Sequence, residues 1–311
     1  MKIICSAPAK VILSGEHAVV FGKPALVAAI DLRLTFSLWP EKTKINDQNV
    51  LFVAKTIKDY LTRQKITYVD RTFNFKIKSD IPLGRGLGSS AAFAVASTAA
   101  LLKFYTGKEF EKDVINRLAY FIEKRFHFNP SGVDNSTVCF GGLIFYRKEF
   151  EFLKNISILN NKIPKNIEGN LFLIDSGLPE ETTAEMVNSV GKLYNRQTSK
   201  IEKTLSAIEK TTKRMVVGLI KEDQIFFRDS LLANEKYLEA LEIVSKKTKQ
   251  LLHDLLVFGW GKITGAGGKK IGSGYILFFA NKKEALVSFL KNKKINFYQF
   301  KQDFQGLRYE T

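Results

Sequence analysis

Three alternating glycines followed by two serines, Gly84-Arg85-Gly86-Leu87-Gly88-Ser89-Ser90, have the residue types and spacing of a phosphate-binding loop. Glycine adopts backbone conformations closed to other residues and lets an anion approach the N–H groups without a Cβ in the way. Serines at a helix N-terminus, together with its free N–H groups and positive dipole end, also favour an anion. A serine-capped tight turn is the plainer interpretation, but the repeated glycines favour anion binding.

The elements that must position this loop are a strand before it and a helix after it. Residues 73–78 alternate apolar and polar side chains with a period of two, which predicts a strand with one buried face. Residues 91–102 contain no charged side chain, which predicts a buried helix. We expect Ser89 and Ser90 to occupy the N-cap region of that helix.

Two other nucleotide-binding patterns fit less well. Gly86-x-Gly88-x-x-Ala91 matches the glycine spacing of a dinucleotide-binding fold, but that fold needs an apolar parallel strand before the glycines and an acidic strand end after the helix. Here the preceding strand is amphipathic, and Gly107 and another helical stretch follow. The pattern Gly-x4-Gly-Lys-Ser/Thr is absent from the sequence.

Composition indicates a globular protein. A chain of 311 residues with 45% hydrophobic residues is long enough for one large or two ordinary domains. No apolar run approaches the roughly 18 residues of a membrane span, and residues 1–5 begin a strand rather than a signal peptide, so we expect a cytoplasmic protein without membrane contact. The two cysteines, Cys5 and Cys139, match no zinc, redox or disulfide-scaffold spacing.

The net charge of +17 raises the question of nucleic-acid binding. The lysines are dispersed, however, and recur at helical spacing among glutamates, as on a solvated helix face. No nucleic-acid motif accompanies them. We therefore expect a small anionic ligand and no nucleic acid, an expectation that a salt-titrated binding assay would test.

The second half of the chain has a different pattern. Residues 171–177 predict a strand and a turn, residues 183–220 and 224–257 are long helical stretches, and residues 275–300 predict strand, helix, strand. Segregated strands and helices indicate an α+β domain with an antiparallel sheet. A segment rich in Asn and Lys between Lys154 and Ile167 marks the boundary, which divides the chain into domains 1–160 and 161–311.

Three motifs resemble those of one enzyme family. Pro8-x-Lys10-Val-Ile-Leu-x-Gly-Glu16-His17-Ala-Val-Val-x-Gly22 resembles the first motif of mevalonate kinases, which belong with galactokinase, homoserine kinase and phosphomevalonate kinase to the GHMP superfamily of small-metabolite kinases. The glycine loop is similar to the second motif of that superfamily, and residues 262–268 to the third. Their order and span cover nearly the whole chain. The resemblance implies an N-terminal domain like ribosomal protein S5 and a ferredoxin-like C-terminal domain.

The resemblance assigns roles that spacing alone does not. On spacing alone, Glu123 is a helix-surface carboxylate and Asp134 a turn residue in the loop 128–135. In the family, the corresponding aspartate is catalytic, and the glutamate and second loop serine bind magnesium, which implies Asp134 for catalysis and Ser90 with Glu123 for Mg²⁺. Magnesium prefers hard oxygen ligands, often only one or two of them from protein. Lys10 would stabilise charge beside Asp134.

The same resemblance implies the ligand contacts. Residues expected to bind ATP are Pro82, Leu83, Gly84, Arg85, Gly86, Leu87, Gly88, Ser89, Ser90, Ala91 and Ala92. Residues expected to contact the substrate are Lys10, Glu16, His17, Asp134, Thr183, Gly265 and Ala266. The implied reaction is ATP- and Mg²⁺-dependent phosphorylation of (R)-mevalonate to 5-phosphomevalonate. Whether Asp134 is a true base or orients the hydroxyl is open, as is the oligomeric state, for which a homodimer is one option.

Two alternatives remain open at this point. Another kinase of the superfamily, such as phosphomevalonate kinase, would use the same motifs, although Gly15-Glu16-His17-Ala18-Val19-Val20 resembles mevalonate kinases more than the Gly-Glu-His-Thr-Asp of galactokinase. A non-catalytic sensor could keep the fold and bind ATP and a metabolite. The joint presence of Lys10, Glu123 and Asp134 argues against the sensor.

Overall fold

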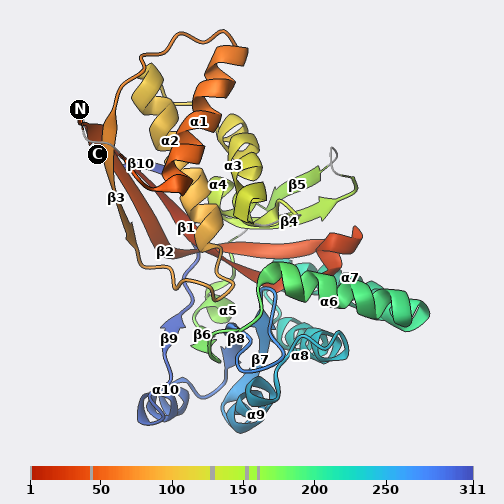
Figure 1. The fold of residues 1–311 in the computed structure, drawn as a ribbon. Helices are drawn as coiled ribbons and strands as arrows, with labels where there is room; N and C mark the ends of the chain where they lie inside the picture. Colours follow the sequence, from red (N-terminus) through yellow and green to blue (C-terminus); the bar gives the residue numbers. More distant parts are fainter. Residues whose placement is uncertain (1, 43–44, 127–129, 151–153, 160–161, 311) are drawn as a thin grey trace.

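The computed structural model describes residues 2–42, 45–126, 130–150, 154–159 and 162–310. Two antiparallel sheets and their helices make up the fold, with the first sheet and helices α1–α4 in the upper part of Figure 1 and the second sheet below. The mixed α+β class predicted from the sequence is confirmed. In the described part of the chain, no helix has the length and apolar character needed to cross a membrane.

The first sheet has the strand order β10-β1-β2-β4-β5, with β3 also paired to β2. Its strands are β1 (Ile3–Ser14), β2 (Ala25–Pro40), β3 (Phe73–Ser79), β4 (Leu143–Lys148), β5 (Lys154–Leu159) and β10 (Arg308–Glu310). The predicted strand over residues 73–78 is therefore confirmed as β3. The strand expected to begin within residues 1–5 is β1, which continues to Ser14 and carries Lys10 in its second half.

Four helices cover one face of this sheet (Figure 1). They are α1 (Gln48–Arg63), α2 (Ser89–Thr106), α3 (Lys112–Phe126) and α4 (Val133–Phe140), and a short 3-10 helix, η1 (Ala18–Phe21), lies within the first motif. Helix α2 is buried along most of its length, as its uncharged sequence predicted. It packs against β1, β2 and α3, so the glycine loop at its N-terminus is fixed by the centre of the core.

The second sheet is antiparallel, as predicted, with the order β7-β8-β6-β9. Its strands are β6 (Leu171–Asp175), β7 (Gly259–Thr264), β8 (Tyr275–Ala280) and β9 (Phe297–Gln299). Successive side chains of a strand point to opposite faces. Leu171 and Leu173 join the core of the first sheet, and Phe172 and Ile174 pack in a second core among the helices. Both faces are thus covered.

The helices of the second half surround this sheet. They are α5 (Lys165–Glu168), α6 (Thr183–Arg196), α7 (Thr198–Ile220), α8 (Gln224–Ala240), α9 (Lys246–Leu255) and α10 (Lys283–Asn292). Each of the two long helical stretches expected from the sequence is divided into two helices. The second division is explained by Ser245, whose side chain accepts a hydrogen bond from the Thr248 N–H and caps the new helix α9.

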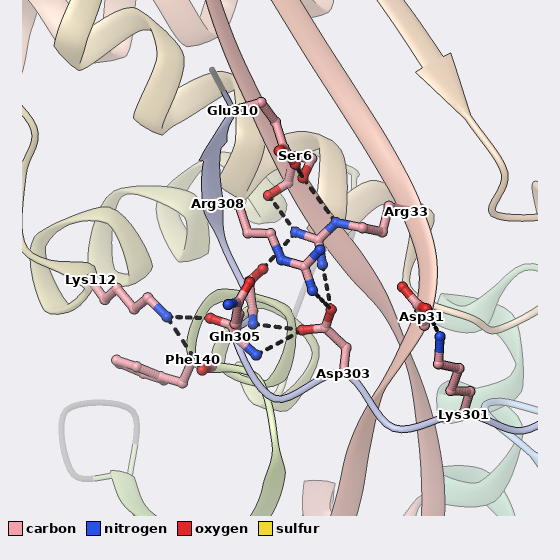
Figure 2. Close-up of polar contacts among 11 residues, drawn as sticks. Ser6, Asp31, Arg33, Lys112, Phe140, Lys301, Asp303, Gln305, Arg308 and Glu310 are labelled. Carbon is pink, nitrogen blue, oxygen red and sulfur yellow. Dashed lines mark hydrogen bonds and ion pairs between the residues drawn. The ribbon is translucent and has the colours of Figure 1, made fainter.

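The end of the chain returns to the first sheet. Strand β10 pairs with β1, so both ends of the described chain lie side by side (Figure 1). Figure 2 shows the polar network that secures this return: the buried Asp303 carboxylate accepts hydrogen bonds from Arg33 at 2.6 Å and Arg308 at 2.6 Å. The domain division at residues 160 and 161 stays a prediction, and the last strand belongs to the sheet of the first range.

Candidate active site

A cavity of about 880 Å³ lies between the two halves of the molecule. It is lined by residues from both halves, as expected for a ligand site. The lining includes these residues predicted from the sequence: Lys10, His17, Pro82, Leu83, Gly84, Arg85, Gly86, Leu87, Gly88, Ser89, Ser90, Asp134, Thr183, Gly265 and Ala266. Four predicted residues, Glu16, Ala91, Ala92 and Glu123, are buried and are not part of the lining.

The glycine loop ends at Gly88, which is the N-cap of α2 with φ 78°. The prediction that Ser89 and Ser90 are the cap residues is corrected, since the helix already begins at Ser89. A Cβ atom on Gly88 would lie 2.8 Å from Lys10 Cγ. Glycine is therefore required here both by the left-handed backbone and by the side chain of Lys10, which passes directly beside it.

Ala91 and Ala92 lie inside α2 and are fully buried. The Ala92 N–H donates to Gly88 O at 2.9 Å within the helix, so it cannot also serve a phosphate. The N–H groups of a first helical turn have no acceptor within the helix. The residues predicted to contact ATP are therefore limited to the glycine loop and the first turn of α2, which excludes Ala92.

The second and third motifs touch through their glycines. A Cβ on Gly86 would lie 3.2 Å from Thr264 O, and one on Gly265 would lie 3.1 Å from Gly86 Cα. Arg85, in the same loop, forms an ion pair with Asp175 at the end of β6. The glycine loop of the first half thus contacts the backbone and a carboxylate of the second half.

Lys10 and Asp134 form an ion pair, with Lys10 Nζ 3.0 Å from Asp134 Oδ1. The Lys10 side chain is 3% exposed and that of Asp134 is 34% exposed, so the carboxylate is the partner open to the cavity. Asp134 lies in the first turn of α4 and not in a loop, which corrects the sequence-based prediction. Gly132 caps this helix with φ 90°, and predicted loop residues 128 and 129 lie outside the described residues.

Ser90 and Glu123 also meet. Ser90 Oγ donates to Glu123 Oε1 at 2.9 Å, and the glutamate is 2% exposed. Burial, reinforced by the negative charge of Asp134, raises the pKa of Glu123 to about 8. In the described residues, no three His, Cys, Asp or Glu side chains gather as a metal site. One hydroxyl and one carboxylate fit Mg²⁺, which commonly completes its shell with phosphate and water oxygens.

His17 faces the cavity from the first motif and is 5% exposed. Its Nε2 lies 2.9 Å from Ala266 O, and because a carbonyl only accepts, Nε2 carries the proton. Burial lowers the pKa of His17, which favours the neutral ring. Nδ1 is a buried acceptor with no partner among the described residues, so it can receive a hydrogen bond from a ligand hydroxyl.

Glu16 is a correction to the predicted substrate contacts. Its side chain is fully buried below the cavity and forms an ion pair with Lys262 of the third motif. The Asn234 side chain donates to its other oxygen at 3.1 Å. The carboxylate is therefore occupied by protein groups and is not available to a substrate.

Sequence reasoning missed two groups of lining residues. Leu34, Ile77, Phe93 and Phe126 add apolar side chains to the cavity lining, and residues 178–182 also line it. These residues come from β2, β3, α2, α3 and the segment before α6, and no short motif joins them. The alternation that predicted β3 places Ile77 on one face of a strand, which was the available signal.

Comparison with known proteins agrees with this site. Residues 48–142, which include the glycine loop and Asp134, match the family described as GHMP kinases N terminal domain. The mevalonate kinase of Pyrococcus furiosus is 33% identical over 304 residues, covering 86% of this chain and 87% of the relative. That of Methanocaldococcus jannaschii is 30% identical over 334 residues, covering 95% and 98%.

A solved structure gives the same result for the fold. The crystal structure of the Methanococcus jannaschii mevalonate kinase superposes with a TM-score of 0.80 at 25% identity, covering 97% of this chain and 98% of that chain. The sequence relatives reach 30% identity over most of the chain, which is beyond a shared fold alone. The chain therefore belongs to the GHMP kinase family and, within it, to the mevalonate kinases.

Proposed function

We propose that this protein transfers the γ-phosphoryl group of ATP to the primary hydroxyl of (R)-mevalonate, giving 5-phosphomevalonate and ADP. The observation that carries the proposal is the Lys10–Asp134 pair, which opens into the same cavity as the glycine loop. Phosphoryl transfer needs mainly positioning and neutralisation of charge. A loop for phosphates and a carboxylate for a hydroxyl, in one cavity, supply both.

The glycine loop would hold the triphosphate of ATP. Backbone N–H groups of the loop and of the first turn of α2, at the positive end of the helix dipole, suit its negative charge. The apolar lining side chains of Leu34, Ile77, Phe93 and Phe126 offer a surface for the base. The nucleotide would then extend from these side chains along the loop towards Asp134.

Ser90 and Glu123 would hold Mg²⁺ near the phosphates. The ion, when bound, supplies positive charge that neutralises phosphate oxygens. Their 2.9 Å contact places a hydroxyl and a carboxylate together, which is a suitable donor pair. Glu123 must be ionised for this role, so binding of the ion is coupled to loss of a proton from the site.

Asp134 would act on the acceptor. The mevalonate hydroxyl donates a hydrogen bond to the open side of this carboxylate, which takes the proton as the new O–P bond forms and the bond to ADP breaks. The Lys10 ammonium, 3.0 Å from Asp134, stabilises negative charge at the transferring group. The unpartnered Nδ1 of His17 would receive a second hydroxyl of the substrate.

The experiment is an ADP-release assay with ATP, Mg²⁺ and four separate acceptors: mevalonate, phosphomevalonate, galactose and homoserine. We expect the highest kcat/KM with mevalonate and slow ADP release without acceptor. A comparable or higher kcat/KM with phosphomevalonate would overturn the substrate assignment. ATP binding without turnover of any acceptor would support the sensor alternative. A homodimeric state and a cytoplasmic location stay predictions.

A further inference from the structure

A buried ion pair lies below the cavity, where sequence reasoning had placed a substrate contact. Lys262, on β7, and Glu16, in the first motif, are both 0% exposed. Lys262 Nζ donates to the Glu16 carboxylate, to Ile12 O at 3.1 Å and to Ile263 O at 2.7 Å. An ammonium has three protons, so its hydrogen-bonding capacity is fully used.

Stability alone does not account for such a pair. Removing two charges from water costs several kcal/mol per ion, and an apolar pair of similar volume often stabilises a protein as well or better. In this protein the pair also joins two segments that are 246 residues apart in sequence. The role of the ion pair therefore depends on which parts of these two segments it holds in position.

On one side the pair holds β1, the strand that carries Lys10. Ile12 is bonded to the third motif three times: its N–H donates to Thr264 Oγ1 at 2.9 Å, and its carbonyl accepts from Thr264 Oγ1 at 3.1 Å and from Lys262. The Lys10 N–H donates to Leu87 O of the glycine loop at 3.0 Å. The backbone at Lys10 is thus fixed by the second motif, and two residues later by the third.

On the other side the pair holds two parts of the cavity lining. Glu16 precedes His17, whose Nε2 lies 2.9 Å from Ala266 O. Lys262 precedes Thr264 and Gly265 on the same strand and loop. One ion pair therefore connects the first motif to the third, and both paired residues lie close in sequence to residues that line the cavity.

We propose that Lys262 is a positioning residue for phosphoryl transfer, which acts through Glu16 and Ile12 to set Lys10 and His17 relative to Gly265 and Ala266. The inference rests on the proposed kinase function. Lys262 itself does not touch the substrate. Its effect arises because a displacement of about 1 Å in a reacting group is enough to lower turnover about a hundredfold.

The test compares Lys262→Met with the double variant Lys262→Met/Glu16→Gln. The single variant leaves a buried carboxylate without its cation and is expected to be strongly destabilised. The double variant removes both charges, and the amide introduced by Glu16→Gln still offers an oxygen to Asn234, so its urea unfolding midpoint should return close to that of the wild type. Its kcat should nevertheless stay at least about tenfold low, with KM for ATP within about threefold.

Asp303→Asn is the matched control. Asp303 is also a fully buried carboxylate paired with a cation of another segment, but its network ties β10 to the first sheet and does not line the cavity (Figure 2). This variant should lose stability while kcat of the folded fraction stays at the wild-type value. It shows what loss of a buried pair does when no positioning is involved.

Amide hydrogen exchange gives a readout that needs no substrate. The N–H groups of Lys10 and Ile12 should exchange about tenfold faster in the double variant and at the wild-type rate in Asp303→Asn. A double variant with wild-type kcat and wild-type exchange would overturn the inference, because the pair would then be structural only. A double variant that fails to fold would also overturn it, since the contribution of the pair would be to folding itself.

The proposed function can fail separately. Wild-type protein that turns over another acceptor and not mevalonate would contradict the substrate assignment, and the same variants measured with that acceptor would still test Lys262. Wild-type exchange rates at Lys10 and Ile12 in the double variant would contradict the positioning role whatever the acceptor.

Discussion

Two lysine–carboxylate pairs each have one member in the first motif, Lys10 in one pair and Glu16 in the other, and the two pairs differ in what surrounds them. In the Lys10–Asp134 pair the carboxylate is 34% exposed and faces the cavity. In the Lys262–Glu16 pair both side chains are fully buried, and both carboxylate oxygens are occupied. The same residue types therefore serve different purposes, because only an open carboxylate can exchange a proton with a ligand.

The open pair should account for most of the catalysis. We predict that Asp134→Asn and Lys10→Ala each lower kcat by about 10²–10⁴-fold and change KM for ATP far less, because both side chains act on the transferring group. Steady-state kinetics with ATP and mevalonate measure both constants. Asp31→Asn is the control, since Asp31 is also 34% exposed and paired with a lysine, Lys301, at 2.8 Å. A rise in KM with intact kcat would mean that the residue only binds substrate.

Breaking the buried pair should have the larger effect on stability. We predict that Glu16→Gln lowers the free energy of unfolding by about 3–5 kcal/mol, because it leaves the Lys262 ammonium buried without an anion. Urea unfolding followed by circular dichroism measures this loss. Glu202→Gln, which breaks a surface pair with Lys23, should cost less than about 1 kcal/mol. Equal losses in the two variants would remove the distinction between the buried and the exposed pairs.

A third carboxyl group beside the buried pair should make stability depend on pH. Burial raises the pKa of Glu235 from 4.5 to about 8, and the nearby carboxylates of Glu239 and Glu16 act in the same direction. A hydrogen bond from the Ile263 N–H and the charge of Lys262 oppose this shift but do not cancel it. Between these values the folded protein holds a proton that the unfolded chain has released, so stability falls as pH rises through this window. Glu235→Gln keeps an acceptor for Ile263 and removes that dependence.

We therefore predict that the stability gain from Glu235→Gln increases from about pH 5 to about pH 8, by roughly 1 kcal/mol per pH unit. Urea unfolding at a series of pH values measures it. Glu284→Gln, at an exposed position of α10, is the control for the substitution itself, and we expect it to change stability little. A gain from Glu235→Gln that is constant across the series would contradict the raised pKa.

Burial alone does not decide the role of a carboxylate, as Glu123 shows. It is nearly as buried as Glu16, but its partner is the cavity-lining Ser90 and not a lysine. We predict that Glu123→Gln raises the Mg²⁺ concentration for half-maximal activity by on the order of tenfold or more. Glu109→Gln, at a surface pair with Lys103, is the control. An unchanged Mg²⁺ requirement would remove Glu123 from the proposed metal site.

The sequence predicted those parts of the fold that depend on local pattern. The period of two at residues 73–78, the uncharged run at residues 91–102 and the strands and helices of the second half are local signals, and the structure confirms them. Element boundaries were less predictable. Gly132 is the N-cap of α4 and places Asp134 in the first turn of a helix, whereas the Asn-Pro and Ser-Gly pairs of the sequence indicated a loop.

The site was predictable where a motif carries it and not where distant segments meet. Lys10 and Asp134 were identified by resemblance to a family, and the structure places them 3.0 Å apart. Glu16 was assigned to the substrate by the same resemblance, since its buried partner could not be foreseen from the sequence. Lysine is rarely fully buried, so from the sequence Lys262 is expected on the surface. Only its pairing with a carboxylate 246 residues away explains why it is buried.

The smallest effect is expected where two lysines interrupt the third motif. Lys269, Lys270 and Ile271 separate Gly268 from Gly272, and two alternatives follow from sequence: the lysines add charge beside the triphosphate, or the segment projects outward into solvent. In the structure Ser273 Oγ donates to Gly268 O at 3.0 Å, which closes this segment on itself. Neither lysine is part of the cavity lining.

Both lysines instead have acidic partners, of which Glu180 is part of the cavity lining and Glu242 is not. Lys270 Nζ lies 3.2 Å from Glu180 and is 67% exposed, and Lys269 Nζ lies 3.6 Å from Glu242. Solvent screens exposed pairs of this kind, so they contribute little, and we predict that Lys269→Ala and Lys270→Ala each change KM for ATP by less than about threefold. Lys301→Ala is the control, since Lys301 is also a paired lysine but is not part of the cavity lining. A rise in KM of about tenfold that shrinks with added salt would instead place these cations beside the triphosphate, because salt screens the attraction between the lysines and the nucleotide and so reduces the effect of removing them.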